Sequence, residues 1–193
     1  MTSVLESVLF GVVLGFSLAV PPGPMNAWIA AVAARSYRSG VVTGLGAMTA
    51  DGVLGAAVFL LERAVDLHAA VRFVYLLGAG VMGYLGLHLL RSTALVESDL
   101  PDERTFLRAL GIGLSNPFQV VWWLTAGVAF AYLGGAVLLL GLFGAILVWV
   151  TAFPWAIRAG ARRHPSFERA VRLASAAILL AFAGYFVALF VLV

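Results

Sequence analysis

The chain has 193 residues, of which 63% are hydrophobic and only 11% are charged. Soluble domains usually carry about 25% charged residues because their surface faces water, so this composition indicates a membrane protein. All twelve basic residues are arginines beside apolar segments, a pattern that orients a membrane protein and does not indicate a nucleic-acid partner. Cysteine is absent, which excludes disulfides, thiol redox chemistry and thiolate metal sites.

The first apolar segment, residues 7–34, has no charge but is interrupted at Pro21–Pro24. Three prolines remove three backbone donors and clash with the preceding turn, so we predict a broken helix. In lipid such a break survives only inside protein or beside a water-filled cavity. A half-helix then begins near Met25, and its free amide groups suit an anion such as a carboxylate. A simple kink or an extracellular loop is the alternative.

The second predicted span, residues 39–61, carries one charge, at Asp51. An aspartate at mid-membrane costs about 2.5–3.5 kcal/mol, which the Val, Leu and Phe residues of this span offset by about 3–5 kcal/mol. We expect Asp51 to face the bundle interior, where a carboxyl group can carry protons or pair with a substrate ammonium. A protonated aspartate bonded to a neighbouring helix, with no transport role, is the alternative.

The remaining spans follow from length. Residues 73–90 form the third span and residues 173–193 the last. Residues 109–157 have no charge and would make a helix of about 73 Å, against a hydrocarbon core of about 30 Å. We therefore predict two spans that reverse at Gly134 and Gly135. The expected fold is all-α, with six transmembrane helices in a single transporter domain over the whole chain.

A second break is predicted in the fourth span, at Asn116 and Pro117, because proline disfavours helix at the residue before it. The Asn116 side chain either satisfies a freed backbone group or binds a ligand. With three spans in each half (about 1–95 and 104–193), the second half inserts upside down relative to the first, as in many secondary transporters. Lesser polar candidates for the cavity lining are Asn26, Thr43, Thr49, Gln119 and Thr125. The tryptophans Trp122, Trp123, Trp149 and Trp155 are interpreted mainly as interface and packing residues.

These motifs resemble the LysE/RhtB family of amino-acid exporters: PPGPMNAW in the first span, an aspartate in a glycine-rich second span, and SNPF in the fourth. The resemblance covers the whole chain in length, span number and motif order. It implies a proton-coupled secondary exporter of amino acids or related small zwitterionic metabolites, without a cofactor, in the cell membrane of a prokaryote, and it is compatible with a homodimer. Its motif positions fall on Pro22, Gly23, Pro24, Asp51, Asn116 and Pro117.

One departure from the family pattern concerns substrate charge. Family members often place an acidic residue directly after Pro-Gly-Pro, whereas this chain has Met25 and Asn26. The neutral pair argues against strongly basic substrates.

Two other functions are weighed against amino-acid export. A metal or inorganic ion exporter of similar fold is the alternative cargo, although hard cations usually take several oxygen ligands and Asp51 is the only intramembrane carboxylate. An intramembrane enzyme needs a nucleophile with a base, or a metal with several ligands. The histidines at 68, 88 and 164 are scattered, so we predict that the chain is not an enzyme.

The arginines also predict orientation. Ten of the twelve lie in the connections after the first, third and fifth spans, and only Arg63 and Arg72 lie on the other side. The positive-inside rule places the ten in the cytoplasm and both termini outside. We expect alkaline phosphatase fused after Val193 to be active and a cytoplasm-specific reporter at the same place to be silent. The reverse pattern would overturn the orientation.

Overall fold

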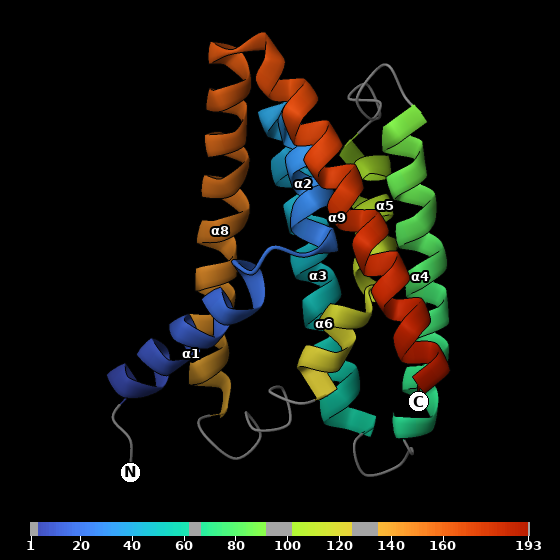
Figure 1. The fold of residues 1–193 in the computed structure, drawn as a ribbon. Coiled ribbons are helices and arrows are strands. Elements are labelled where there is room, and N and C mark those ends of the chain that lie inside the picture. Colours follow the sequence, from blue (N-terminus) through green and yellow to red (C-terminus); the bar gives the residue numbers. More distant parts are fainter. Residues whose placement is uncertain (1–3, 62–66, 92–101, 125–134, 193) are drawn as a thin grey trace.

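The protein is described by a computed structural model in which residues 4–61, 67–91, 102–124 and 135–192 are placed. Within these residues the chain forms eight helices and confirms the predicted all-α class (Figure 1). The helices are α1 (Val4–Ala19), α2 (Pro24–Ala33), α3 (Tyr37–Leu61), α4 (Leu67–Arg91), α5 (Asp102–Leu114), α6 (Pro117–Trp122), α8 (Gly135–Arg163) and α9 (Pro165–Leu192).

The predicted break in the first apolar segment is confirmed. Helices α1 and α2 are long and apolar enough to cross a membrane only as a pair, and they are bent by 78° at the break. Helices α3, α8 and α9 each qualify alone, so the described residues contain three candidate spans, or four with the bent pair. The count of six stays a prediction, and the proposed reversal at Gly134 lies outside the described residues.

The second predicted break lies between α5 and α6. Asn116 has an extended backbone, with φ −83° and ψ 109°, and Pro117 is the first residue of α6. The Asn116 carboxamide oxygen accepts a hydrogen bond from the backbone N–H of Phe118 at 3.2 Å. The sequence left open whether the Asn116 side chain satisfies a freed backbone group or binds a ligand. The structure shows the first of these uses.

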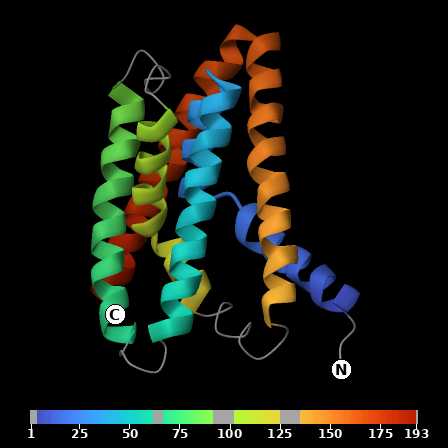
Figure 2. The same ribbon diagram turned by 180° about the vertical axis from the view of Figure 1, so that it is seen from behind.

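Helix α2 lies at the centre of the bundle. It packs against α3, α8 and α9, while α1 packs against α8, α3 against α5, and α4 against α9 (Figures 1 and 2). Nine of its ten residues are buried. This placement follows from composition, because a helix that is hydrophobic on all sides has no face to present to water. The break therefore brings the start of α2 into the protein interior.

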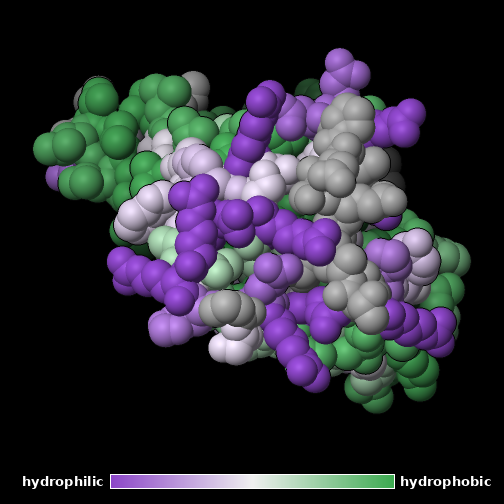
Figure 3. All heavy atoms as spheres, turned by 90° about the horizontal axis from the view of Figure 1, so that it is seen from above, coloured by the Kyte–Doolittle hydropathy of each residue, from purple (hydrophilic) through white to green (hydrophobic). Residues whose placement is uncertain are grey.

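The polar residues gather at one end of the bundle. Helices α2, α4 and α8 end there and α3, α5 and α9 begin there, and Figure 3 shows hydrophilic side chains covering this end. Arg35 forms an ion pair with Glu168 and Arg38 one with Asp102, and both pairs are solvent-accessible. Helix α1 begins and α9 ends at the opposite end. This separation agrees with the arginine pattern, and the side of the membrane stays a prediction.

Helices α1 and α8 approach each other through glycine. A Cβ added at Gly11 or Gly15 would run into the backbone carbonyl oxygen of Leu138 or Leu142, and one added at Gly141 would meet the carbonyl oxygen of Val8. Small residues that let helix backbones approach closely are a known basis of helix association in lipid. The close contact of α1 with α8 therefore depends on glycine, which has no side chain, at these positions.

Two glycines of α8 give a matched test of this contact. We expect Gly141→Ala to destabilise the protein by about 1–3 kcal/mol, the usual cost of overpacking. Gly144→Ala should be neutral or slightly stabilising, because a Cβ there meets nothing within 4 Å and alanine is the better helix former. Unfolding of both variants in detergent measures the difference. Equal stabilities would contradict the close packing of α1 on α8.

Candidate functional site

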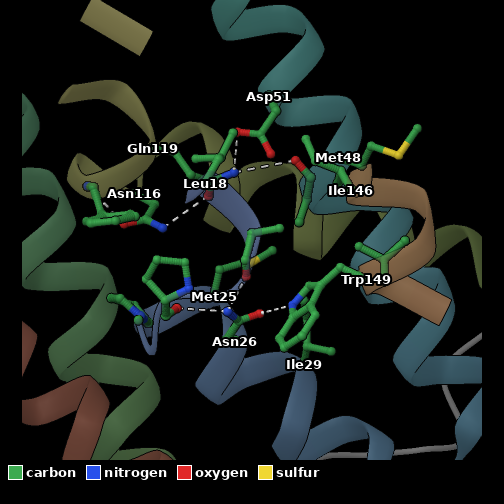
Figure 4. Close-up of a pocket in the computed structure, with 17 residues that line it drawn as sticks. Leu18, Met25, Asn26, Ile29, Met48, Asp51, Asn116, Gln119, Ile146 and Trp149 are labelled. Atoms are coloured by element: carbon green, nitrogen blue, oxygen red, sulfur yellow. Dashed lines mark hydrogen bonds between the residues drawn. The ribbon is translucent and has the colours of Figure 1, made fainter. Parts of the chain in front are cut away.

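A partly open cavity lies where the two helix breaks meet the long helices α3 and α8 (Figure 4). Its water-accessible space is about 50 Å³, and since one water needs about 10–15 Å³ by this measure, it has room for only a few waters. Its lining comes from α1, the break, α2, α3, α6, α8 and the α5–α6 junction, and it consists of Leu18, Ala19, Pro21, Gly23, Pro24, Met25, Asn26, Ile29, Ala47, Met48, Asp51, Asn116, Phe118, Gln119, Ile146, Trp149 and Val150.

Asp51 projects from α3 into this region and is only 5% exposed. Its Oδ1 atom accepts hydrogen bonds from Nε2 of Gln119 at 2.9 Å and from Nε1 of Trp123 at 3.2 Å. Within the described part of the chain, no hydrogen bond reaches Oδ2, which is turned toward the middle of the cavity in Figure 4. A buried carboxylate thus keeps one oxygen available for a ligand or a proton.

A chain of amide side chains connects the second break to this carboxylate. Nδ2 of Asn116 donates to Oε1 of Gln119 at 3.0 Å, and Nε2 of Gln119 also approaches the carbonyl oxygen of Ala47 at 3.5 Å. Asn116 is 1% exposed and Gln119 is 5% exposed. Asn116, which caps α6, therefore positions the Gln119 amide that donates to Asp51. A movement of α6 would change the hydrogen bonding of the Asp51 carboxylate.

Asn26 closes the first break. Its Nδ2 atom donates to the carbonyl oxygens of Ala19 at 2.6 Å and Pro21 at 2.9 Å, both of which lie at the break. Its Oδ1 atom accepts from Nε1 of Trp149 on α8 at 3.1 Å. Because all three bonds are made within the protein, Asn26 ties α1, α2 and α8 together and has little capacity left for a ligand.

The start of α2 has unsatisfied donors. Gly23 precedes the helix in an extended conformation and supplies no side-chain cap. The first amide with a backbone partner is that of Ala27, which donates to the carbonyl oxygen of Gly23 at 2.9 Å. In the described part of the chain, the N–H groups of Met25 and Asn26 have no partner, and both residues line the cavity. Exposed N–H groups at a helix start carry partial positive charge.

The structure brings most of the predicted site residues together. Six of the eight line the cavity, namely Gly23, Pro24, Asn26, Asp51, Asn116 and Gln119. Two do not: Pro22 is exposed, and Pro117 is buried against Gly78 of α4. Among the lesser candidates, the hydroxyls of Thr43 and Thr49 bond to carbonyls of their own helix, and Thr125 lies outside the described residues.

Two tryptophans have a larger role at the site than the sequence predicted. Trp123 and Trp149 were interpreted mainly as interface and packing residues, yet their indole N–H groups hold Asp51 and Asn26. A signal was present in the sequence, because a tryptophan in the middle of an uncharged span needs a partner for its N–H when buried. The pattern did not show which polar residue that partner would be.

Comparisons with known proteins identify the family. The sequence model of the family described as LysE type translocator matches residues 16–189. A curated relative from Bacillus subtilis (strain 168), named "Putative amino acid efflux protein YcgF", is 31% identical over 181 residues, which cover 83% of this chain and 84% of that protein. No solved structure matches the chain.

The bond between Asn26 and Trp149 can be measured by a double-mutant cycle. We expect Asn26→Leu to destabilise the protein more than Trp149→Phe does, because it removes three hydrogen bonds and the phenylalanine keeps the stacking on Phe153. Their coupling energy should be about 0.6 kcal/mol and at most about 1.7 kcal/mol, the average and the maximum found for side-chain hydrogen bonds within membranes. Unfolding in mixed micelles gives all four stabilities.

A matched control for this cycle is Thr151→Val on α8. Its hydroxyl donates to the carbonyls of Leu147 and Val148 in its own helix, so it should show no coupling to Asn26→Leu. A coupling energy near zero for Asn26 and Trp149 as well would mean that the bond does not join α2 to α8.

Proposed function

Because the chain belongs to the LysE type translocator family, whose members are membrane transporters and not enzymes, we propose that it exports amino acids or related small zwitterionic metabolites by secondary active transport. The observation that carries the proposal is the cavity between the two broken helices, with a buried carboxylate at its edge. The name of the Bacillus relative, a putative amino acid efflux protein, supports amino acids as the cargo.

The proposed architecture is six spans in two inverted halves. The helix contacts support it, because several contacts of one half have a counterpart in the other, although α2–α3 and α8–α9 do not. The packing of α1 on α8 corresponds to that of α5 on α3, and the packing of α2 on α9 corresponds to that of α6 on α4. Because α3 corresponds to α8 and α4 to α9, the contacts α3–α8 and α4–α9 each join two equivalent helices. Inverted repeats of this kind place the substrate site at the repeat interface near the bilayer midplane.

The two breaks also correspond residue by residue. Pro24 and Pro117 are each the first residue of a half-helix, and Asn26 and Gln119 each follow by two positions. The Asn26 amide then bonds to Trp149 on α8 of the other half, and the Gln119 amide bonds to Asp51 on α3 of the other half. These crossed bonds support a site built from both halves, in which only one half supplies a carboxylate.

Asp51 is the residue that we propose couples transport to protons. It is the only acidic residue among the described residues of the cavity lining, and its Oδ2 atom can hold either a proton or a cationic group. When protonation and substrate binding exclude each other at one atom, inward movement of protons drives outward movement of substrate. We further propose that the arginine-rich end faces the cytoplasm of a prokaryotic cell, with both termini outside.

A metal or another inorganic ion is the competing cargo. Hard cations usually bind six or more oxygen ligands, whereas the described lining of the cavity offers one carboxylate. Among the described residues there is no group of three or more His, Asp or Glu that could hold a metal. No specific observation therefore favours an ion, and amino acids remain the proposed cargo.

Efflux from proteoliposomes tests the proposal. Vesicles loaded with labelled amino acids and given a pH gradient should release at least one of them faster than protein-free vesicles. Asp51→Asn keeps a similar shape but cannot take up a proton, so it should reduce gradient-driven efflux at least tenfold.

The control for the carboxylate is Glu103→Gln, an exposed position on α5 away from the cavity, which should keep wild-type efflux. If no amino acid leaves faster than from protein-free vesicles, export of amino acids is wrong. If the Asp51→Asn protein still responds fully to the gradient, the proton role of Asp51 is wrong.

A further inference from the structure

The polar groups that line the cavity divide into those with protein partners and those without. The amide side chains of Asn26, Asn116 and Gln119 all bond to protein atoms. The groups without a partner in the described part of the chain include the N–H of Met25, the N–H of Asn26 and Oδ2 of Asp51, besides the N–H groups of Gly23 and Gln119. Buried polar groups are rarely left unpaired, so the N–H groups of Met25 and Asn26 and the Oδ2 atom of Asp51 are candidate contacts for a ligand.

The two N–H groups suit a carboxylate. They lie at the start of α2, where the aligned peptide dipoles give about half a positive charge, and no side chain caps this end. The corresponding end of α6 differs, because Asn116 caps it through Phe118. Both half-helices begin with proline, but only α6 has a side-chain cap, so the uncapped start of α2 distinguishes the first break from the second.

The free carboxylate oxygen suits an ammonium group. Asp51 lies across the cavity from Met25 and Asn26 (Figure 4), and its 5% exposure makes an unpaired negative charge costly. Among the described residues, the cavity lining contains no basic side chain that could neutralise this carboxylate. Two donors on one side and one anionic acceptor on the other are the complement of a zwitterion.

The rest of the lining is mainly apolar. Leu18, Met25, Ile29, Met48, Ile146 and Val150 supply hydrocarbon and thioether surface around the polar groups. A charged or strongly polar substrate side chain would find no partner among them, and an unpaired polar group in such surroundings costs several kcal/mol. The water-accessible space of about 50 Å³ favours a small side chain, although the two methionines can adjust their shape.

We propose that the cavity binds α-amino acids through both of their main-chain charges and selects those with a small, uncharged, apolar side chain. The substrate carboxylate accepts hydrogen bonds from the N–H groups of Met25 and Asn26, and its ammonium group donates to Oδ2 of Asp51. This assignment rests on the proposed function, amino-acid export, and adds the substrate class and the contacts that recognise it.

Counterflow of labelled alanine in proteoliposomes, with unlabelled competitors, tests the selectivity. Alanine and valine should compete well. Alaninamide lacks the carboxylate, N-acetylalanine lacks the ammonium, and lysine and glutamate add a charge, so each should compete at least tenfold more weakly. Equal competition by lysine, glutamate or either blocked analogue would overturn the assignment. If lysine is transported and alanine is not, export stands and this assignment fails; if no amino acid is transported, the proposed function itself fails.

A pair of variants at Gly23 tests the carboxylate contact separately. The extended backbone at Gly23 accepts any residue, and an added Cβ would come no closer than 3.9 Å to its nearest neighbour, the carbonyl oxygen of Pro21. Gly23→Ser introduces a cap for the free N–H groups of α2, which typically stabilises a helix relative to alanine at the same position by about 1 kcal/mol. Gly23→Ala introduces the same Cβ without the acceptor.

We expect the serine variant to be more thermostable than the alanine variant and to bind alanine at least tenfold more weakly, because its hydroxyl occupies the donors that the substrate needs. The comparison between the two variants isolates the hydroxyl from the added carbon. Equal affinities for alanine in the two folded variants would show that the start of α2 does not bind the substrate carboxylate.

Discussion

The cost of leaving a peptide group unpaired in lipid is the constraint on which this structure depends. The prolines at Pro21–Pro24 end α1 and begin α2 with a bend of 78°, and the break frees carbonyl oxygens on one side and N–H groups on the other. Asn26 satisfies the carbonyl oxygens of Ala19 and Pro21. The surrounding helices bury α2, whereas Val20 and Pro22 of the break are exposed, and the cavity lies beside the break.

The two breaks are alike in position but differ in how their freed groups are satisfied. At the second break, Asn116 caps α6 and, through Gln119, holds one oxygen of Asp51. At the first break, Gly23 leaves the start of α2 uncapped. Donors therefore remain on one side of the cavity and an acceptor on the other. An inverted repeat that was symmetrical in side chains as well as in backbone would not create this difference. Because of it, the proposed site has hydrogen-bond donors on one side and an anionic acceptor on the other.

The sequence predicted the features that depend on one helix at a time. Proline content located both breaks, and the position of Asp51 within an otherwise uncharged span predicted its burial. Features that depend on the contact of two helices were not predictable in this way. Trp123 and Trp149 were assigned to packing, since spacing along a helix gives depth in the membrane but not the partner on the next helix. For the same reason the sequence placed Pro22 and Pro117 at the site, whereas Pro22 is exposed and Pro117 packs against Gly78 of α4.

We propose that substrate binds between the start of α2 and the carboxylate of Asp51. An experimental structure of the protein in membrane-like lipid, determined with a saturating concentration of a transported amino acid, tests it most directly. We predict density for the amino acid in this cavity, with its carboxylate within about 3 Å of the N–H groups of Met25 and Asn26 and its nitrogen at a similar distance from Oδ2 of Asp51. Density for the substrate elsewhere in the bundle, with the cavity unchanged, would contradict the claim.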